Sequence, residues 1–365
     1  MASSQSRKSV LVTGANGYIG NAVCKAFVRA GWCVFGLVRQ PEAAQSLAAQ
    51  EVIPLLGSAT LQDSGASDPS NTDELLQRYP WLKDLLAQTV KLDVIIGCSE
   101  QWPDYVSHYT SVTQFFRALA SISSSNGTKP LVLWSSGCKD YGVGALSDAP
   151  DLRPHTEESP LMTEGFLAPR TEYSQKIFSH SDIFDAVLLR PTNVYGYNSS
   201  FYGAAFQFAE ELASKGSGLD RSGKIEVPLE GRSIMHALHV DDCAEAYLAL
   251  AEHSGRNAIA GQCFNISSSS FETTDQVVQA LARDYSIAEK VLCVGETSET
   301  PGHLANIFGY SQWVDSSKIR AATGWQDKRL SFSQGIGVYR RAYEATKGSD
   351  SGSRNVDKLH TVSLK

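Results

Sequence analysis

The 365-residue chain has little of what marks secreted, membrane and metal-binding proteins. Its seven cysteines lie far apart with no C-x-x-C pair, and an odd, scattered set is typical of reduced thiols in a reducing compartment. No apolar run approaches the roughly 18 residues that a membrane helix needs, and the first ten residues hold no apolar signal core. We therefore expect a cytoplasmic protein without a membrane partner.

An excess of positive charge is also missing. The chain has 32 basic and 39 acidic residues, a net charge of −7, whereas nucleic acids and anionic membranes select basic surfaces. No group of His, Cys and Asp has metal-ligand spacing, so we expect no metal site. The hydrophobic fraction of 42% is that of a globular protein, long enough for one large domain and a smaller companion. A small molecule remains the expected partner.

Apolar runs alternate with helical patterns through residue 190. The runs at 10–12, 32–38, 52–56, 92–96, 131–134 and 186–189 predict strands, and the segments 17–30, 75–89, 105–121 and 173–179 predict helices, with another beginning at Pro41. Strands that are apolar on both faces are typical of a parallel sheet covered by helices on both sides. The sequence therefore predicts a Rossmann-type, doubly wound α/β sheet.

The order of elements loosens after about residue 195. We expect the Rossmann-type domain to span 8–195 and a smaller α/β substrate-side region to span 196–347, with segments around 236–266 returning to the first domain. The polar stretch 348–365 predicts a flexible tail. The segments 197–235 and 295–313 are rich in aromatic residues, so we expect them to line a rather apolar substrate pocket.

A glycine-rich loop joins the first strand to the first helix. Gly14 allows a tight turn, Gly17 lets the backbone approach a pyrophosphate, and Gly20 lets the helix pack closely on the strand. The phosphates would meet the N–H groups and the positive dipole at the start of the helix. The predicted cofactor-binding residues of this loop are Gly14, Asn16, Gly17, Tyr18, Ile19 and Gly20.

The residue at the end of the second strand bears on which dinucleotide binds. An acidic side chain there would hydrogen-bond the ribose of NAD, but the sequence has Leu37-Val38-Arg39, with no acid before Glu42. The guanidinium of Arg39 can pair with a 2′-phosphate. We therefore expect NADP(H) rather than NAD(H).

Five motifs in order resemble the extended short-chain dehydrogenases/reductases, the NAD-dependent epimerase/dehydratase family. They are the glycine loop, Ser135-Ser136 before Tyr141-Gly142, Glu157-Glu158-Ser159-Pro160, the run Arg190-Pro191-Thr192-Asn193-Val194-Tyr195-Gly196, and His239-Val240-Asp241-Asp242. The resemblance implies a contact between Asn193 and the nicotinamide, and it makes a homodimer plausible. Asp241 also occupies a position typical of a helix N-cap, so we expect it to cap the helix that follows. We expect His239 to be a packed residue.

Family members carry a Ser or Thr after strand five and a Tyr followed four residues later by Lys. Here the nearest lysine is Lys176, with Tyr173 only three residues before it. The resemblance implies that Ser136, Tyr173 and Lys176 form the catalytic centre, and that Lys176 also contacts the cofactor. The tyrosine would exchange the hydroxyl proton while the lysine lowers its pKa.

The shifted spacing leaves three hypotheses open. The first is an NADP(H)-dependent reductase, dehydrogenase or epimerase acting on a small carbonyl or hydroxyl compound through the shifted centre. The second is an NADP(H)-binding scaffold with non-redox chemistry, such as a lyase or cyclase. The third is a non-catalytic NADP(H) sensor. For the second, the candidate groups are Glu100, His108, Tyr141 and Glu172.

Overall fold

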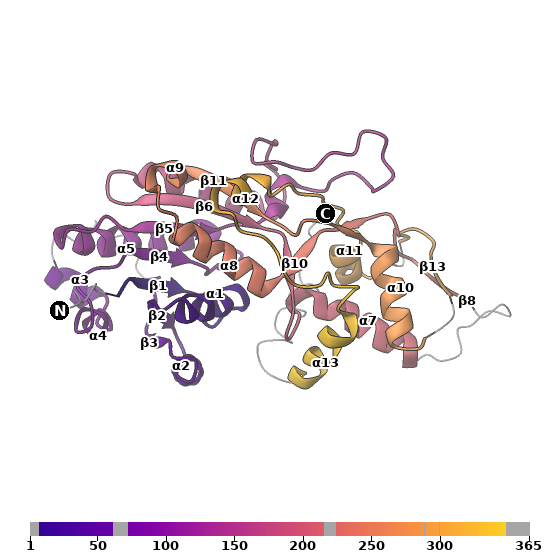
Figure 1. Ribbon diagram of the computed structural model, residues 1–365, viewed down its shortest axis with the longest axis horizontal. Coiled ribbons are helices and arrows are strands. Elements are labelled where there is room, and N and C mark those ends of the chain that lie inside the picture. Colours follow the sequence, from indigo (N-terminus) through magenta and orange to yellow (C-terminus); the bar gives the residue numbers. More distant parts are fainter. Residues whose placement is uncertain (1–6, 61–71, 215–223, 288–289, 299, 348–365) are drawn as a thin grey trace.

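Two lobes of unequal size make up the chain (Figure 1). The computed structural model describes residues 7–60, 72–214, 224–287, 290–298 and 300–347. The larger lobe contains the N-terminal elements, and the smaller one contains most of the C-terminal helices. In this part of the chain, no helix combines the length and apolarity that crossing a membrane requires.

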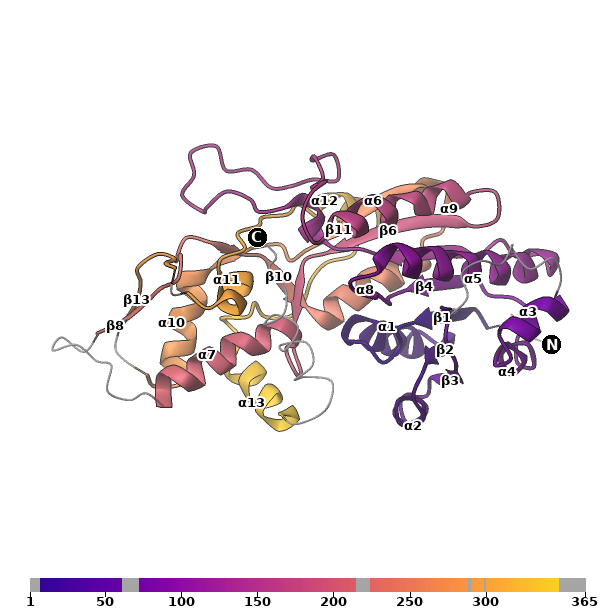
Figure 2. The same ribbon diagram turned by 180° about the vertical axis from the view of Figure 1, so that it is seen from behind.

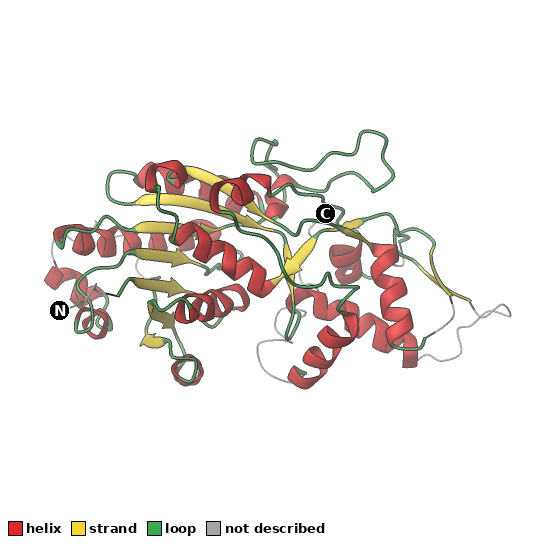
Figure 3. Cartoon of the chain, in the orientation of Figure 1, coloured by secondary structure: helices red, strands yellow, loops and turns green. Residues whose placement is uncertain are grey.

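A parallel sheet of seven strands forms the centre of the larger lobe (Figure 3). From edge to edge the strands are β11 (Gln262–Ile266), β6 (Asp185–Pro191), β5 (Leu131–Ser135), β4 (Val94–Gly97), β1 (Ser9–Thr13), β2 (Cys33–Val38) and β3 (Ile53–Leu56). The strand order reverses between β1 and β4. In open α/β sheets, ligands bind beyond the carboxyl ends of the strands at such a point.

Helices cover both faces of this sheet because successive residues of each strand point to opposite sides. Val10 and Val12 pack in one core with α1 (Tyr18–Arg29) and α8 (Val240–Ala251), while Leu11 packs in a second core with α5 (Tyr105–Ser125). The helix α6 (Ala168–Gln175) lies beside α5, as the view from behind shows (Figure 2). The remaining helices of this lobe are α2 (Pro41–Ala48), α3 (Thr72–Arg78), α4 (Leu82–Leu86), α9 (Arg256–Ile259) and α12 (Ser317–Thr323).

The smaller lobe has its own core of aromatic and aliphatic side chains. Its helices are α7 (Gly203–Ser214), α10 (Thr274–Asp284), α11 (Gly302–Phe308) and α13 (Ile336–Thr346). Short strand pairs complete it and join it to the larger lobe: β8 (Lys224–Val227) with β13 (Lys290–Cys293), β7 (Asn193–Tyr195) with β10 (Ala237–His239), and β9 (Ile234–Met235) with β12 (Glu272–Thr273). The rings of Phe206 and Phe332 lie 5.3 Å apart at the centre of this core.

The predicted parallel, doubly wound sheet is confirmed. In the larger lobe α8 packs on α1, and β11 extends the sheet beside β6. The helix cap was assigned to the wrong residue: His239 is the N-cap of α8, and its Nδ1 accepts a hydrogen bond from the backbone N–H of Asp241 at 3.1 Å. The domain boundaries stay a prediction, and the expected tail at 348–365 lies outside the described residues.

Candidate functional site

The glycine loop forms a tight turn at the carboxyl end of β1. Gly14 has a positive φ of 66°, which favours glycine, and its carbonyl accepts a hydrogen bond from the N–H of Gly17 at 2.8 Å. Gly17 is the N-cap of α1, and no side chain caps its first N–H groups. These groups are therefore free to meet an anionic phosphate.

The side of the loop that faces the sheet leaves no space for larger residues. A Cβ at Gly14 would lie 2.7 Å from the carbonyl oxygen of Cys98, and one at Gly20 would overlap the carbonyl oxygen of Gly14. Asn16 and Gly17 are exposed at the tip. Tyr18 and Ile19 pack partly against the core, and the Tyr18 hydroxyl donates a hydrogen bond to the carbonyl of Gly196. The loop thus fits the pyrophosphate of a dinucleotide.

Arg39 follows β2 at the same edge of the sheet. Its side chain is exposed, and no ion pair engages it within the described part of the chain. Burial lowers the pKa of His108, and the positive charge of Arg39 contributes to this shift. Arg39 therefore lies on the side of the sheet that α5 covers, with its guanidinium available to an anion.

A buried carboxylate organises the turn after β5. The side chain of Asp140 is fully buried, and its Oδ2 accepts a hydrogen bond from the Ser136 hydroxyl at 2.5 Å. Its Oδ1 accepts from Nε and Nη2 of Arg170 at 3.0 and 2.8 Å. Arg190 Nε lies 3.4 Å from Oδ2, and the Thr171 hydroxyl donates to Oδ1 at 3.3 Å. Ser136 is therefore held by an ionic cluster.

Arg170 extends this cluster to the end of β4. Its Nη1 lies 3.5 Å from Oε1 of Glu100, three residues after β4. Burial opposes the charge of Arg170, but the carboxylates of Asp140 and Glu100 outweigh it and raise the pKa of the guanidinium. The cluster thus links the ends of β4 and β5, where α/β sheets of this kind bind ligands.

The side chains of α6 that face this cluster are not the predicted Tyr173 and Lys176. Arg170, Thr171 and Ser174 are its buried residues. The Tyr173 ring instead packs edge-on against Tyr109 of α5, with 5.7 Å between ring centres.

Lys176 lies on the outer surface beside Tyr173. Its ammonium is 2.8 Å from Oε1 of Glu172 and 3.5 Å from the centre of the Tyr173 ring. It lines a groove of about 530 Å³ together with side chains of α5 and with His180. None of these contacts is shared with Ser136, so the structure does not bring Ser136, Tyr173 and Lys176 together. Their joint catalytic role stays a prediction.

Another lysine, which the sequence analysis missed, does lie at the cluster. Lys139 belongs to the 3-10 turn Cys138–Tyr141 after β5, and its Nζ is 3.7 Å from the centre of the Tyr310 ring. Burial lowers the pKa of Lys139 to about 7, and the positive charge of Arg170 acts in the same direction. Its sequence signal was weak: it is one lysine inside the motif between Ser136 and Tyr141.

The other candidate groups have structural partners. His108 Nε2 lies 2.8 Å from the carbonyl oxygen of Ser99. Tyr141 donates a hydrogen bond to Asn265 Oδ1 at 2.7 Å. Asn193 begins β7 and is partly buried.

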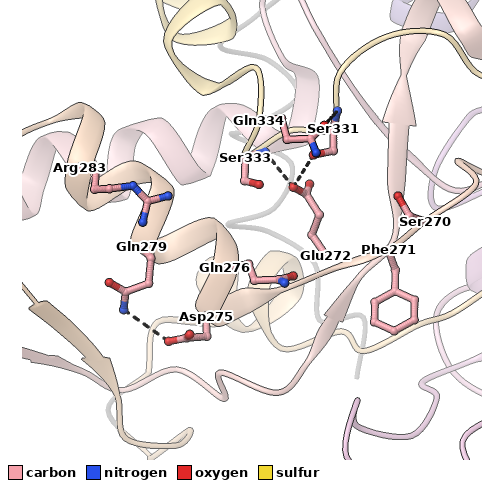
Figure 4. Close-up of a pocket in the computed structure, with 10 residues that line it drawn as sticks. All are labelled: Ser270, Phe271, Glu272, Asp275, Gln276, Gln279, Arg283, Ser331, Ser333 and Gln334. Atoms are coloured by element: carbon pink, nitrogen blue, oxygen red, sulfur yellow. Dashed lines mark hydrogen bonds between the residues drawn. The ribbon is translucent and has the colours of Figure 1, made fainter.

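The aromatic residues expected to line a pocket mostly form the small-lobe core instead. Tyr202, Phe206 and Phe308 are buried there, whereas Tyr310 faces Lys139. A polar cavity of about 420 Å³ opens on the smaller lobe (Figure 4). Its Glu272 carboxylate accepts hydrogen bonds from Ser331 Oγ at 2.7 Å and from the N–H of Ser333 at 2.9 Å. This cavity contains none of the predicted site residues.

Comparisons with known proteins agree with this geometry. The sequence profile described as "NAD dependent epimerase/dehydratase family" matches residues 10–267. The chain belongs to this family. Its members are enzymes of the extended short-chain dehydrogenase type, which confirms the family and the enzyme class expected from the sequence. No protein of curated function matches the chain significantly.

Solved structures share the fold over nearly the whole chain. A dTDP-glucose 4,6-dehydratase from Bacillus anthracis, in complex with NAD, is 16% identical with a TM-score of 0.64, covering 94% of this chain and 98% of its own. A UDP-glucose 4-epimerase from Thermotoga maritima, with UDP-glucose, is 18% identical with a TM-score of 0.63, covering 93% and 99%. RMD from Pseudomonas aeruginosa, complexed with NADPH, is 17% identical with a TM-score of 0.60, covering 93% and 98%.

Proposed function

We propose that the protein is an NADP(H)-dependent oxidoreductase that acts on a small carbonyl or hydroxyl compound. The observation that carries this proposal is Arg39, an exposed guanidinium beside the glycine loop without an ion pair in the described residues. A guanidinium in this place can bind a 2′-phosphate through paired, charge-assisted hydrogen bonds. Complexes of proteins with this fold include both NAD and NADPH, so the fold alone does not choose between them.

The dinucleotide would supply or accept a hydride when bound. Gly14, Gly17 and the first N–H groups of α1 would hold its pyrophosphate, and Arg39 its 2′-phosphate. Its nicotinamide end would extend toward the carboxyl ends of β4 and β5. There Glu100 and Arg170 would border the reacting atoms.

A small substrate is favoured over a nucleotide sugar because Arg232, a cation near the expected pocket, is already paired with two carboxylates. Arg232 lies in the segment expected to form the pocket, but its guanidinium pairs with Glu230 at 2.8 Å and with Asp148 at 3.0 Å. A diphosphate would have to displace both carboxylates. Lys215 and Arg221 lie outside the described residues.

Fluorescence titration with NADPH and NADH tests the cofactor. We expect Arg39→Asp to weaken NADPH binding at least about tenfold, since it replaces a charge-assisted contact with a repulsion. NADH binding should change by less than about threefold, because NADH has no 2′-phosphate. Arg341→Asp is the matched control, an exposed charge reversal on α13 of the smaller lobe. Equal NADPH affinity in the wild type and Arg39→Asp would refute the proposal for Arg39.

The placement of Tyr173 and Lys176 favours a second candidate. Because these side chains lie between α5, α6 and solvent, the bound dinucleotide could serve non-redox chemistry or act as a sensed ligand. Tight NADPH binding and a transformation that proceeds without even transient oxidation or reduction of the cofactor would support this alternative. Stoichiometric oxidation of NADPH would support the oxidoreductase.

A further inference from the structure

Lys139 is a lysine without a counter-ion at the place where the two lobes meet. In the ranges that the structure describes, its ammonium forms no ion pair and donates no hydrogen bond. Its contact is with the face of the Tyr310 ring, which attracts a cation without neutralising its charge. The side chain is partly buried, so it keeps a route to water.

The smaller lobe fixes the turn that carries this lysine. The Tyr310 hydroxyl donates a hydrogen bond to the carbonyl of Lys139 at 3.3 Å. The amide of Gln312 donates to the carbonyls of Cys138 and Gly142 at 2.7 and 3.0 Å. The backbone of the turn is therefore held on both sides of Lys139, and the side chain has a defined position.

The charges around Lys139 are arranged to favour its neutral form. Arg170 of α6 adds a second positive charge, and its own carboxylate partners, Asp140 and Glu100, are engaged with it. Burial lowers the pKa of Lys139 to about 7 and Arg170 contributes to the shift. Burial also raises the pKa of Tyr310 to about 12, so this phenol stays protonated. An amine with a pKa near neutrality can both give and take a proton.

Within the described residues, the side chains that the family resemblance implied for this purpose are engaged elsewhere. The face of α6 toward the cluster presents Arg170, Thr171 and Ser174 instead of a tyrosine and a lysine. Ser136 has its hydroxyl committed to Asp140. Lys139 stands four residues after β5, at the carboxyl edge of the sheet, where open α/β sheets bind their ligands.

We propose that Lys139 Nζ is the group that transfers a proton to or from the substrate oxygen, in place of Tyr173 and Lys176. This inference rests on the proposed oxidoreductase function. In reduction, the ammonium of Lys139 would protonate the carbonyl oxygen while the carbonyl carbon accepts the hydride that bound NADPH would supply, with NADP⁺ as the second product. The product is an alcohol, and the neutral amine regains its proton from solvent. Oxidation reverses each transfer.

Competitive acetylation with acetic anhydride, followed by mass spectrometry, tests the first requirement on the whole protein. Only the neutral amine reacts, so the labelling rate against pH reports the pKa of each lysine. We expect half-maximal labelling of Lys139 near pH 7, whereas a free lysine side chain has a pKa of about 10.4. The exposed Lys83 is labelled in the same experiment as the comparison. Saturating NADPH should slow the labelling of Lys139 at least about fivefold, because a bound ligand covers most of its site.

A second readout uses NADPH oxidation by 4-nitrobenzaldehyde as a probe carbonyl. Lys139→Met should lower kcat at least about 100-fold and leave NADPH affinity within about threefold. Lys139→Arg should lose as much, since an arginine keeps the charge but does not release its proton. Lys83→Met is the control for both measurements, and urea midpoints show whether each variant is folded.

The outcomes separate this inference from the function on which it rests. Failure of the wild type to bind NADPH would overturn both. NADPH binding with Lys139 labelling like Lys83, or without protection by NADPH, would overturn only the role of Lys139. Full activity of Lys139→Arg would also overturn it, because a fixed cation that binds an anionic substrate would then suffice. If the wild type does not reduce 4-nitrobenzaldehyde, the acetylation experiment alone tests the role of Lys139.

Discussion

Arg170 and Asp140, thirty residues apart in the sequence, meet through two hydrogen bonds of 3.0 and 2.8 Å to one carboxylate oxygen. This contact sets the rotation of α6, because it draws Arg170 toward the end of β5. Tyr173 and Lys176 then fall on the side of α5 and solvent. A single buried ion pair therefore decides which side chains of α6 reach the expected nicotinamide site.

Replacing Asp140 should be strongly destabilising. Asp140→Asn leaves Arg170 and Arg190 with one less negative charge in a buried site, and breaking such a pair costs about 3–5 kcal/mol of unfolding free energy. Urea denaturation followed by far-UV circular dichroism measures the loss. The control is Asp148→Asn, whose exposed pair with Arg232 should contribute less than about 1 kcal/mol. Equal losses in the two variants would contradict the role of Asp140.

Gly20 should not tolerate even a methyl group. The added Cβ of Gly20→Ala would overlap the backbone carbonyl of Gly14, which cannot move without opening the turn that we expect to bind the phosphates. We expect a loss of about 1–3 kcal/mol in stability together with weaker NADPH binding. Gly302→Ala is the matched control, since open space surrounds that position at the start of α11. Unchanged NADPH affinity in Gly20→Ala would argue against phosphate binding at this loop.

A buried histidine should make the fold sensitive to acid. Burial lowers the pKa of His236 to about 4, and its Nδ1 accepts a hydrogen bond from the N–H of Val314 at 3.1 Å. The unfolded chain binds this proton near pH 6.5, before the folded one does. Its contribution is therefore intact above pH 6.5 and is lost as the pH falls toward 4, about 3 kcal/mol in all.

The non-titrating variant His236→Asn isolates this effect. Between pH 7.5 and 4.5 the unfolding free energy of the wild type should fall more steeply than that of the variant. Other buried histidines titrate in both proteins, so the difference between the two slopes reports His236 alone. Parallel slopes would show that His236 is not the cause.

Lys176 separates the two accounts of the catalytic centre. In the structure its ammonium pairs with Glu172 on the surface, and exposed pairs contribute less than about 1 kcal/mol. Lys176→Ala should therefore lower the unfolding free energy by less than about 1 kcal/mol. The NADPH affinity of the variant should stay within about threefold of the wild type. A large loss of NADPH affinity would instead support the contact with the cofactor that the family resemblance implies. The same fluorescence titration measures it.

The sheet could be predicted from the sequence because its signals are local. Apolar runs bounded by Gly or Pro mark the strands. The helix predicted over 75–89 is divided near Pro80 into α3 and α4. Short elements such as β9 and β12 were missed, since two-residue strands have no periodicity to detect. The N-cap role of His239 was also missed, because the sequence does not show which neighbouring side chain accepts a hydrogen bond from the N–H of Asp241.

The site was predictable only where its residues adjoin in the chain. The glycine loop was proposed from a motif and Arg39 from a strand end, and the structure places the loop between β1 and α1 and Arg39 directly after β2. The cluster of Asp140, Arg170 and Glu100 joins three separate segments, so its pairing appears only in three dimensions. The direction of Lys139 likewise depends on Tyr310, which is 171 residues away.

A crystal structure of the complex with NADPH tests the central claim most directly. The account predicts the pyrophosphate at the first N–H groups of α1, the 2′-phosphate on Arg39, and the nicotinamide within reach of Lys139 and Arg170. A dinucleotide bound with its 2′-phosphate away from Arg39, or with its nicotinamide turned toward Tyr173 and Lys176, would contradict it.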